Sequence, residues 1–462
     1  MKRALIVVTV LVVAQLVVAG GIVTNTNQSA QFVRTLSRNA STEVDAIYFN
    51  PAGLTQLENG WHFALYNQTI MQEKTVENNF PGLNQNEFVG EVNVPLFPNV
   101  YATYKKDKFA VSFGFGPNGG GGTADYADGL PSFEIPISQI PPMINGMNIP
   151  TDAYKADIEF KGSSVYYGFQ LNASYALNEM FSVAVGGRYI SAVNTYEGAI
   201  SNIQINPTFP DLGLMGNFMS AVQFFNALAQ VNPEAAAYAA MVQDVDVDVK
   251  QTGTAITPII GLNVRPVEKL NVGIKYELNT ALELTNETTI DGSGLFPDEE
   301  VARADIPAIF ALGAEYAFLP TFRGQFSINY YFDKNAQWDY FVEENGERVK
   351  RNKADLVDNN YMEIGVGLEY DLTDALRVSA GFLNSTTGVS ENYQTDISHS
   401  LSSSTVGLGL RYTIGGVWDV DLGTLYTMYD ESTRSGSSNN VPYVETYNRS
   451  NVAIALGLGY HF

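Results

Sequence analysis

The C-terminal stretch 451-NVAIALGLGYHF-462 alternates, residue by residue, between two kinds of side chain. One face carries large apolar groups and ends in two aromatic rings: Val452, Ile454, Leu456, Leu458, Tyr460 and Phe462. The other face carries small or polar groups: Asn451, Ala453, Ala455, Gly457, Gly459 and His461. A period of two residues predicts a β-strand. A soluble sandwich also hides one apolar face, so this strand alone does not decide the class of sheet.

The same alternation returns in segments spread over the chain. Each segment places apolar residues on one face and glycine, polar or charged residues on the other: 165–175, 270–279, 322–333, 363–371, 406–414 and 418–426. The apolar faces carry aromatic residues at the strand ends, as in the aromatic girdles of outer-membrane barrels. A bilayer admits no open sheet edge, so such a sheet has to close on itself.

The connections between these segments alternate between short and long. Six are short: YKKDK, ALNEM, RPVEK, FLPTF, DLTDA and IGGV. The long ones fill 72–92, 118–156, 198–247, 285–299, 335–358, 386–401 and 431–447. Short turns on one side and long loops on the other are typical of outer-membrane barrels. We therefore predict an all-β fold, a 14-stranded antiparallel transmembrane β-barrel, with strands near 60–71, 93–105, 108–117, 157–177, 180–197, 248–265, 268–284, 300–318, 321–334, 359–371, 375–385, 402–414, 417–430 and 448–462.

Composition and the N-terminus agree with an exported barrel. The net charge of −23 argues against a nucleic-acid partner, and the absence of Cys rules out disulfides. Residues 1–19 have a basic start, an apolar run and small residues at a cleavage point, which predicts a signal peptide. The alternative is a membrane anchor, but the run is shorter than the ~20 apolar residues that a spanning helix needs.

Two segments do not belong to a simple barrel. Residues 20–58 precede the first strand, and we expect them to form a plug in the lumen, where inward-facing glycines leave room. The alternative is a flexible linker.

Residues 214–243 show apolar residues at helical spacing and are divided by Pro233, which predicts two helices within the 198–247 loop. Their apolar residues either pack against neighbouring loops or bind an apolar ligand; the groove candidates are Leu214, Phe218, Met219, Val222 and Phe225.

Together with the stretches 20-GGIVTNTNQSAQFVR-34 and 49-FNPAGL-54, this architecture resembles the FadL family. These are outer-membrane transporters of long-chain fatty acids and other hydrophobic compounds. The resemblance covers the whole chain after the signal peptide and implies that the plug is the family's hatch. It assigns Asn50, Pro51 and Ala52, followed by Gly53, to a hatch turn. The alternative is an ordinary turn that leads into the first strand.

The family also has an inward kink in its third strand, which opens a gap in the barrel wall. In this chain the expected position is Gly114, Gly116, Pro117 and Gly119, because proline removes a ladder donor and glycine marks a bulge. The alternative is that these residues simply begin the long loop.

The resemblance implies passive uptake of a hydrophobic small molecule: capture at the loops, passage to an apolar lumen pocket, a hatch shift and lateral release into lipid. We expect location in the outer membrane of a Gram-negative bacterium, a monomeric state, no cofactor, no metal and no enzyme activity. Phe462 is expected to contact the barrel assembly machinery. An acidic cargo would need a cation, and Arg188, Lys275 and Arg303 are the candidates. The alternatives are an aqueous porin, an outer-membrane enzyme and an adhesive barrel.

Overall fold

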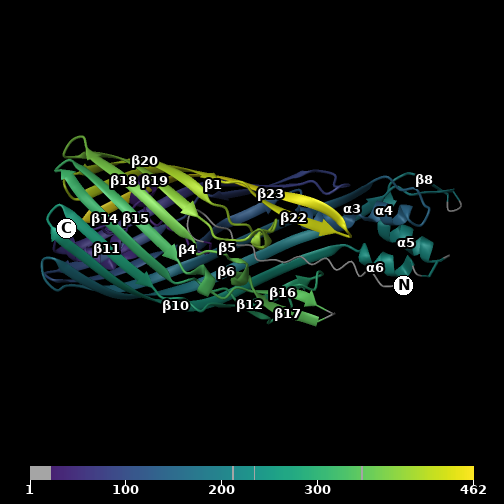
Figure 1. The fold of residues 1–462 in the computed structure, drawn as a ribbon, viewed down its shortest axis with the longest axis horizontal. Coiled ribbons are helices and arrows are strands. Elements are labelled where there is room, and N and C mark those ends of the chain that lie inside the picture. Colours follow the sequence, from purple (N-terminus) through teal and green to yellow (C-terminus); the bar gives the residue numbers. More distant parts are fainter. Residues whose placement is uncertain (1–21, 211–212, 231, 234, 345–346) are drawn as a thin grey trace.

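A computed structural model describes residues 22–210, 213–230, 232–233, 235–344 and 347–462 (Figure 1). The predicted signal peptide, residues 1–19, lies outside these ranges. Within the described ranges, no helix is both long enough and apolar enough to cross a membrane.

The main element is a closed antiparallel barrel of 14 strands, which confirms the predicted fold class. Closure occurs where β1 pairs with β23, from His62 opposite His461 to Asn78 opposite Glu445. The wall strands are β1 (Gly60–Asn78), β2 (Glu87–Val94) with β3 (Asn99–Lys106), β4 (Phe109–Tyr126), β5 (Tyr154–Ala176), β6 (Phe181–Ile205), β10 (Val245–Val267), β11 (Leu270–Glu277) with β12 (Glu283–Asp291), β13 (Val301–Arg303) with β14 (Ile309–Leu319), β15 (Phe322–Tyr331), β18 (Met362–Asp371), β19 (Leu376–Thr386), β20 (Ser403–Ile414), β21 (Trp418–Tyr429) with β22 (Ser432–Ser438), and β23 (Val441–His461).

Shorter elements lie inside the barrel and in its loops. The α-helices are α1 (Ala30–Thr35), α2 (Ala46–Phe49), α3 (Pro131–Ser138), α4 (Ile140–Asn145), α5 (Ala221–Ala229) and α6 (Ala235–Met241). The 3-10 helices are η1 (Pro51–Gln56), η3 (Asp333–Asn335), η4 (Lys353–Leu356) and η5 (Glu391–Tyr393). The loop strands are β7 (Thr208–Phe209), β8 (Leu214–Met215), β9 (Met219–Ser220), β16 (Asp339–Glu344) and β17 (Glu347–Asn352).

The apolar face of the wall points outward, as the alternation predicts. In β23, Leu456 and Leu458 are 58% and 44% exposed, whereas Ala453 and Ala455 are completely buried on the inner face. Large apolar side chains on the outside and small ones within are the arrangement of a barrel surrounded by lipid.

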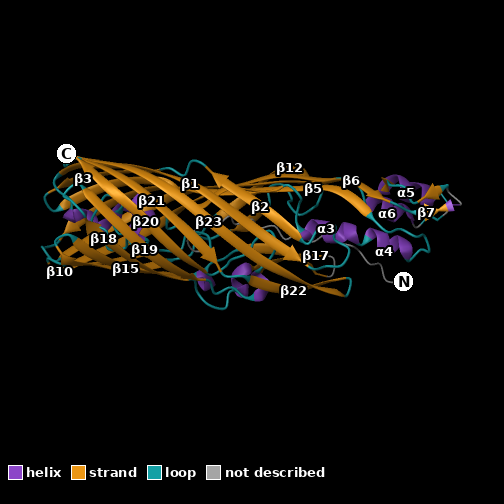
Figure 2. Cartoon of the chain, turned by 90° about the horizontal axis from the view of Figure 1, so that it is seen from above, coloured by secondary structure: helices purple, strands orange, loops and turns teal. Residues whose placement is uncertain are grey.

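Several strands run much farther than their apolar pattern. β4 continues to Tyr126 and β6 to Ile205, into segments that the sequence places in long loops. The outward residues there are charged; Lys161 pairs with Asp125 at 3.1 Å, for example. The predicted loop bounds were wrong at these points because the hydrogen-bond ladder persists after the lipid-facing alternation ends. At the outer end, α3 to α6 form a helical head, opposite the C-terminus and the short turns (Figures 1 and 2).

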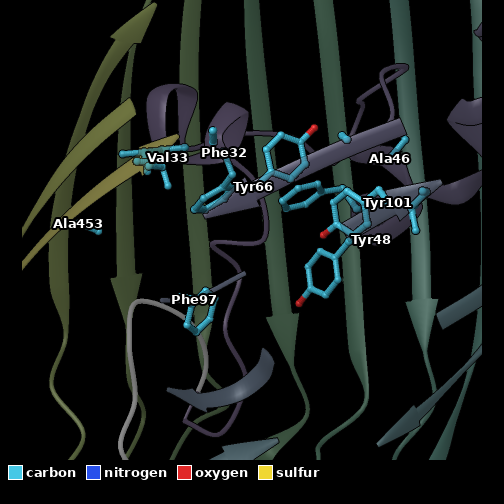
Figure 3. Packing of buried hydrophobic residues seen from close by; sticks show 14 of the residues in the cluster. Phe32, Val33, Ala46, Tyr48, Tyr66, Phe97, Tyr101 and Ala453 are labelled. Atoms are coloured by element: carbon cyan, nitrogen blue, oxygen red, sulfur yellow. The ribbon is translucent and has the colours of Figure 1, made fainter. Parts of the chain in front are cut away.

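Residues 22–57, called the hatch below, fill the lumen with α1, α2 and η1. Ser29 Oγ accepts a hydrogen bond from the Phe32 N–H at 3.0 Å and caps α1. Apolar hatch side chains pack on one another and on the wall (Figure 3). Phe32 stacks on Phe49 with ring centres 5.6 Å apart. The hatch therefore has its own small core, and a flexible linker is excluded for these residues.

Glycines on the inner wall let the hatch backbone come close. A Cβ atom on Gly367 would lie 2.6 Å from the carbonyl oxygen of Thr35, and one on Gly407 would lie 2.5 Å from that of Val33. Gly459 is different, because the nearest atom to its Cβ position is 3.5 Å away and belongs to Asp419. Most of the inward glycines make room for the hatch, but Gly459 does not.

Buried ion pairs join the hatch to strands β18 to β21. Arg34 pairs with Glu369 at 2.5 Å and with Asp421 at 3.1 Å. Glu43 pairs with Arg411 at 2.7 Å, and Arg411 also pairs with Asp421 at 3.0 Å. Removing one partner from a buried network leaves a charge without compensation, so this network fixes the hatch in place.

Replacing Gly367 with valine should displace the hatch, because the new side chain has no space beside the Thr35 carbonyl. We expect a several-fold higher conductance of the purified protein in planar bilayers. The matched control is Gly459→Val, another inward glycine, which should leave conductance unchanged. Equal conductance for the two variants would contradict the close packing of the hatch.

The Asp421→Ala variant should be less stable by about 3 to 5 kcal/mol, because Arg34 and Arg411 lose a buried carboxylate. Urea unfolding followed by tryptophan fluorescence measures this difference. Asp430→Ala, at an exposed position just after the same strand, is the control and should change stability little.

Candidate functional site

The hatch turn lies buried against β5 and β10. Asn50 Oδ1 accepts from the Ala52 N–H at 3.4 Å, and Asn50 Nδ2 donates to the Leu262 carbonyl at 3.0 Å. Pro51 begins η1, and its carbonyl accepts from Ser174 Oγ at 2.6 Å. A Cβ on Gly53 would collide with the Ser41 carbonyl. The motif is thus a rigid corner of the hatch bonded to the wall, seven residues before β1, and more than a turn that leads into that strand.

Tyr48, next to this corner, was not among the residues singled out from the sequence. Its hydroxyl donates to the Asn25 carbonyl at 2.8 Å. The side chains of Arg188 and Lys275 lie over its ring, 4.9 and 4.7 Å from the centre. A tyrosine in a tail segment gives no sign of this contact, which depends on the wall strands behind it.

The three cations predicted for an acidic cargo all have carboxylate partners. Arg188 and Lys275 each lie 2.6 Å from Glu277, and Arg303 lies 2.7 Å from Asp305. Lys275 also donates to the Tyr48 carbonyl at 2.9 Å. These charges position the hatch and the wall, so the lumen beside the hatch offers an acidic ligand little that is not already used.

The third wall strand, β4, departs from its neighbour where the glycines begin. It pairs with β3 from Phe109 to Phe115 and meets β2 again only at Ala124 and Asp125. On this side, residues 116–123 have no ladder partner in β2 or β3 within the described chain. On the other side, the pairing with β5 shifts register between Pro117 and Gly119 and again between Gly120 and Gly122.

The start of the hatch occupies this edge of β4. Thr24 forms an antiparallel bridge with Gly119. The Asn25 N–H donates to the Asn118 carbonyl at 2.8 Å, and Gln28 Nε2 donates to the Pro117 carbonyl at 2.9 Å. The strand therefore does not simply pass into a loop at these residues. Of the predicted kink residues, Gly114 lies earlier, against Ile47 of the hatch, and Gly119 lies at the bridge.

A small cavity of about 70 Å³ lies in the outer lumen between β5, β6, β12 and the β16–β17 hairpin. Its wall includes the aromatic residues Tyr166, Phe296, Trp338 and Phe341. Tyr166 is also the residue that packs over Gly119, 3.1 Å from the position of a Cβ there. The cavity thus adjoins the residue that contacts the hatch bridge.

The candidate groove residues of the long loop do not share one helix face. α5 begins only at Ala221, capped by Ser220, so the expected helical positions of Leu214, Phe218 and Met219 were wrong. Gly213 and Gly216 have positive φ angles of 71° and 78°, which explains why the chain turns there. Leu214 lies in β8 and Met219 in β9.

These residues also differ in exposure. Phe225 is completely buried in the helical head and packs on Phe224, with ring centres 5.1 Å apart. Val222 is half-buried. Phe218 is 40% exposed, and the Lys155 ammonium lies 4.2 Å from its ring centre. Phe225 is therefore a packing residue, whereas part of the Phe218 ring is exposed.

No protein-family model matches the chain, and no curated protein matches it. Solved structures do match. A FadL homologue from Pseudomonas aeruginosa has a TM-score of 0.68 at 13% identity, covering 96% of this chain and all of that one. The toluene transporter TodX from P. putida has a TM-score of 0.59 at 13% identity, covering 91% and 95% of the two chains. The toluene transporter TbuX from Ralstonia pickettii has a TM-score of 0.54 at 15% identity, covering 90% and 94%.

At these identities the likeness is one of fold, and it extends over nearly the whole of each chain. The chain has the fold of the FadL-type transporters.

Proposed function

We propose that this chain is an outer-membrane transporter through which hydrophobic small molecules move passively. The proposal is carried by one combined observation: the hatch fills the lumen, and the hydrogen-bond ladder of the barrel wall is interrupted. The hatch closes the straight route through the barrel, while residues 116–123 of β4 lack a ladder partner on one side. An aqueous porin needs the opposite arrangement, an open lumen in an unbroken wall.

The proposed route starts at the helical head, where Phe218 and its neighbours Met219 and Val222 catch an apolar molecule. The molecule moves to the cavity beside Tyr166, whose lining combines the aromatic residues with charged ones such as Arg303 and Asp339. Displacement of the Thr24–Gly119 bridge then exposes the edge of β4, and the cargo leaves sideways into lipid. Tyr167 of β5, the register partner of Pro117, points outward and is 39% exposed. The proposed exit therefore lies within the apolar, lipid-facing band of the wall.

The solved neighbours support the cargo class, since two of them are toluene transporters. The pairing of Arg188, Lys275 and Arg303 with carboxylates also favours an uncharged cargo beside the hatch. Toluene is accordingly the first probe, with uptake compared between cells that make the protein and cells that lack it.

Phe462 is 64% exposed at the end of β23, which leaves it accessible to the assembly machinery during insertion.

The Gly119→Arg variant should abolish most of the toluene uptake, because a long cation at this position obstructs the proposed exit. Thr321→Arg is the matched control: it adds the same side chain at an exposed position in a short turn, and Thr321 is not among the residues with a positive φ angle. It should transport as the unmodified protein does. Full uptake by Gly119→Arg, measured on folded protein, would rule out lateral exit at this position.

Alanine substitutions at two phenylalanines of the long loop distinguish ligand capture from packing of the helical head. Phe225→Ala should destabilise the helical head by about 3 to 5 kcal/mol, as expected for a buried aromatic side chain, and speed its proteolysis. Phe218→Ala should leave proteolysis unchanged but slow uptake at low toluene concentration. Unchanged uptake by Phe218→Ala would remove this residue from the route.

A further inference from the structure

Two of the three histidines in the chain face each other where the barrel closes. His62 of β1 is directly opposite His461 of β23, and their ring centres are 6.0 Å apart with the ring planes inclined by 20°. The neighbours Trp61 and Phe63 point outward, at 43% and 39% exposure, so the two histidines, as cross-strand partners, point inward. The first and the last wall strand thus each place one imidazole at the same position.

The hydrogen-bond ladder brings these two side chains as close as a strand pair allows. Trp61 and Phe462 exchange backbone hydrogen bonds of 3.0 and 3.1 Å across the β1–β23 seam. Hydrogen-bonded and non-hydrogen-bonded pairs alternate along an antiparallel ladder, so the next pair, His62 and His461, is of the non-hydrogen-bonded kind. Side chains lie closer together in such a pair than in the pairs on either side of it.

Each imidazole is oriented by one backbone carbonyl. His62 Nε2 donates to the Glu58 carbonyl at 2.9 Å, and His461 Nε2 donates to the Gly416 carbonyl at 2.8 Å. A carbonyl oxygen only accepts, so both Nε2 atoms carry a proton, and in the neutral ring Nδ1 keeps a free lone pair. Neither Nδ1 atom has a hydrogen-bond partner among the described residues. Histidines that bind metals are oriented in this way, by donating the second ring nitrogen to a carbonyl or carboxylate.

A cavity of about 290 Å³ lies beside the pair, at the end of the barrel that carries the C-terminus (Figure 1). Its lining includes both histidines together with Glu58 and Gly459. Gly459 is the inward glycine that makes no room for the hatch. It lies two positions before His461 on the same face, so its missing side chain leaves space beside that ring. Because Glu58 is exposed, solvent and small ions reach this cavity.

The spacing of the two rings is that of imidazoles sharing one metal ion. Zinc lies about 2.0–2.1 Å from an imidazole nitrogen, so the centres of two rings on one ion are about 5 to 6 Å apart. The observed separation is 6.0 Å, and the rings are nearly parallel. Rotation of the rings, without displacement of either strand, is therefore enough to direct both Nδ1 atoms at one ion.

The ligand type decides the class of ion. Imidazole nitrogen suits zinc, copper and nickel, whereas magnesium and calcium prefer oxygen ligands. Among the described residues, no group of three or more His, Cys, Asp and Glu side chains is placed to hold a metal ion. Water would accordingly occupy the other coordination positions, and such an open site binds more weakly than the closed four-ligand sites of structural zinc.

We propose that His62 and His461 bind a divalent ion of the zinc, copper and nickel class at the seam of the barrel. The ion joins the first wall strand to the last, at the end where β1 begins and β23 finishes. A ligand that binds only the folded state raises the free energy of unfolding, so the bound ion stabilises closure of the wall. The site lies apart from the proposed cargo route and does not depend on the transport function.

Zinc alone is the probe, because it has no redox chemistry of its own. The purified full chain, made without a polyhistidine tag and freed of metal with EDTA, is titrated with zinc chloride by calorimetry in a non-ionic detergent. We expect one zinc ion per chain, bound in the micromolar range. His62→Gln and His461→Gln should each weaken binding at least about tenfold, because a single imidazole remains.

His399→Gln is the matched control, because it removes the third histidine of the chain. His399 stacks on Tyr447 in the outer lumen, with ring centres 5.0 Å apart, and its loss should leave zinc binding unchanged. Magnesium should not compete with zinc. The temperature at which the barrel loses its heat-modifiable migration on gels provides a second measurement. Zinc should raise it for the unmodified protein and for His399→Gln, but not for His62→Gln.

Undiminished zinc binding by both seam variants would overturn the site. So would an equal loss of binding in His399→Gln, since that result reports zinc held by scattered histidines rather than by the pair. Absence of zinc binding to the unmodified protein would overturn it as well. Toluene uptake tests the transport proposal separately, so the failure of one proposal is distinguishable from the failure of the other.

Discussion

The rest of this structure depends on one contact: the backbone of the hatch approaches the backbone of the barrel wall closely. The wall positions behind α1 are glycines, so the carbonyls of Val33, Thr35 and Leu36 lie where side chains would otherwise stand. A barrel of this width could hold a column of water. Removing the inward side chains from four neighbouring strands makes space for a folded segment there, and the direct route through the lumen is closed.

Electrostatics divides the lumen into two zones. Around the hatch, buried charges are matched, and the network from Arg34 to Arg411 joins the inserted segment to strands distant in sequence. Such a network adds specificity of position more than stability, because desolvation offsets much of the attraction. In the outer lumen, Lys74 of β1 lies directly opposite Arg449 of β23, so like charges meet across that strand pair.

Much of the fold can be read from the sequence because lipid imposes a simple rule. Most outward residues in the band are apolar, so seven strands are visible as clearly alternating segments, and the alternation of short and long connections indicates the others. The rule ends at the membrane surface, and the prediction is wrong there, because it places the outer parts of β4 and β6 in loops. The predicted helix begins before the actual start of α5 because the apolar spacing extends to Leu214, whereas Gly213 and Gly216 turn the chain there. The ion pairs of Arg188 and Lys275, and the pair of histidines at the seam, depend on register between strands, which the sequence alone does not provide.

The outer continuation of the strands has a mechanical consequence. β6 contains 25 residues, which corresponds to about 80 Å of strand at ~3.3 Å per residue, against a hydrocarbon layer of ~30 Å. Even allowing for tilt, a large part of the sheet rises beyond the bilayer as a stiff stalk. Its height depends on how far the paired strands continue past the apolar band, and lengthening a pair at its outer end leaves the alternation below unchanged. The distance between the helical head and the bilayer can therefore change without altering the lumen below.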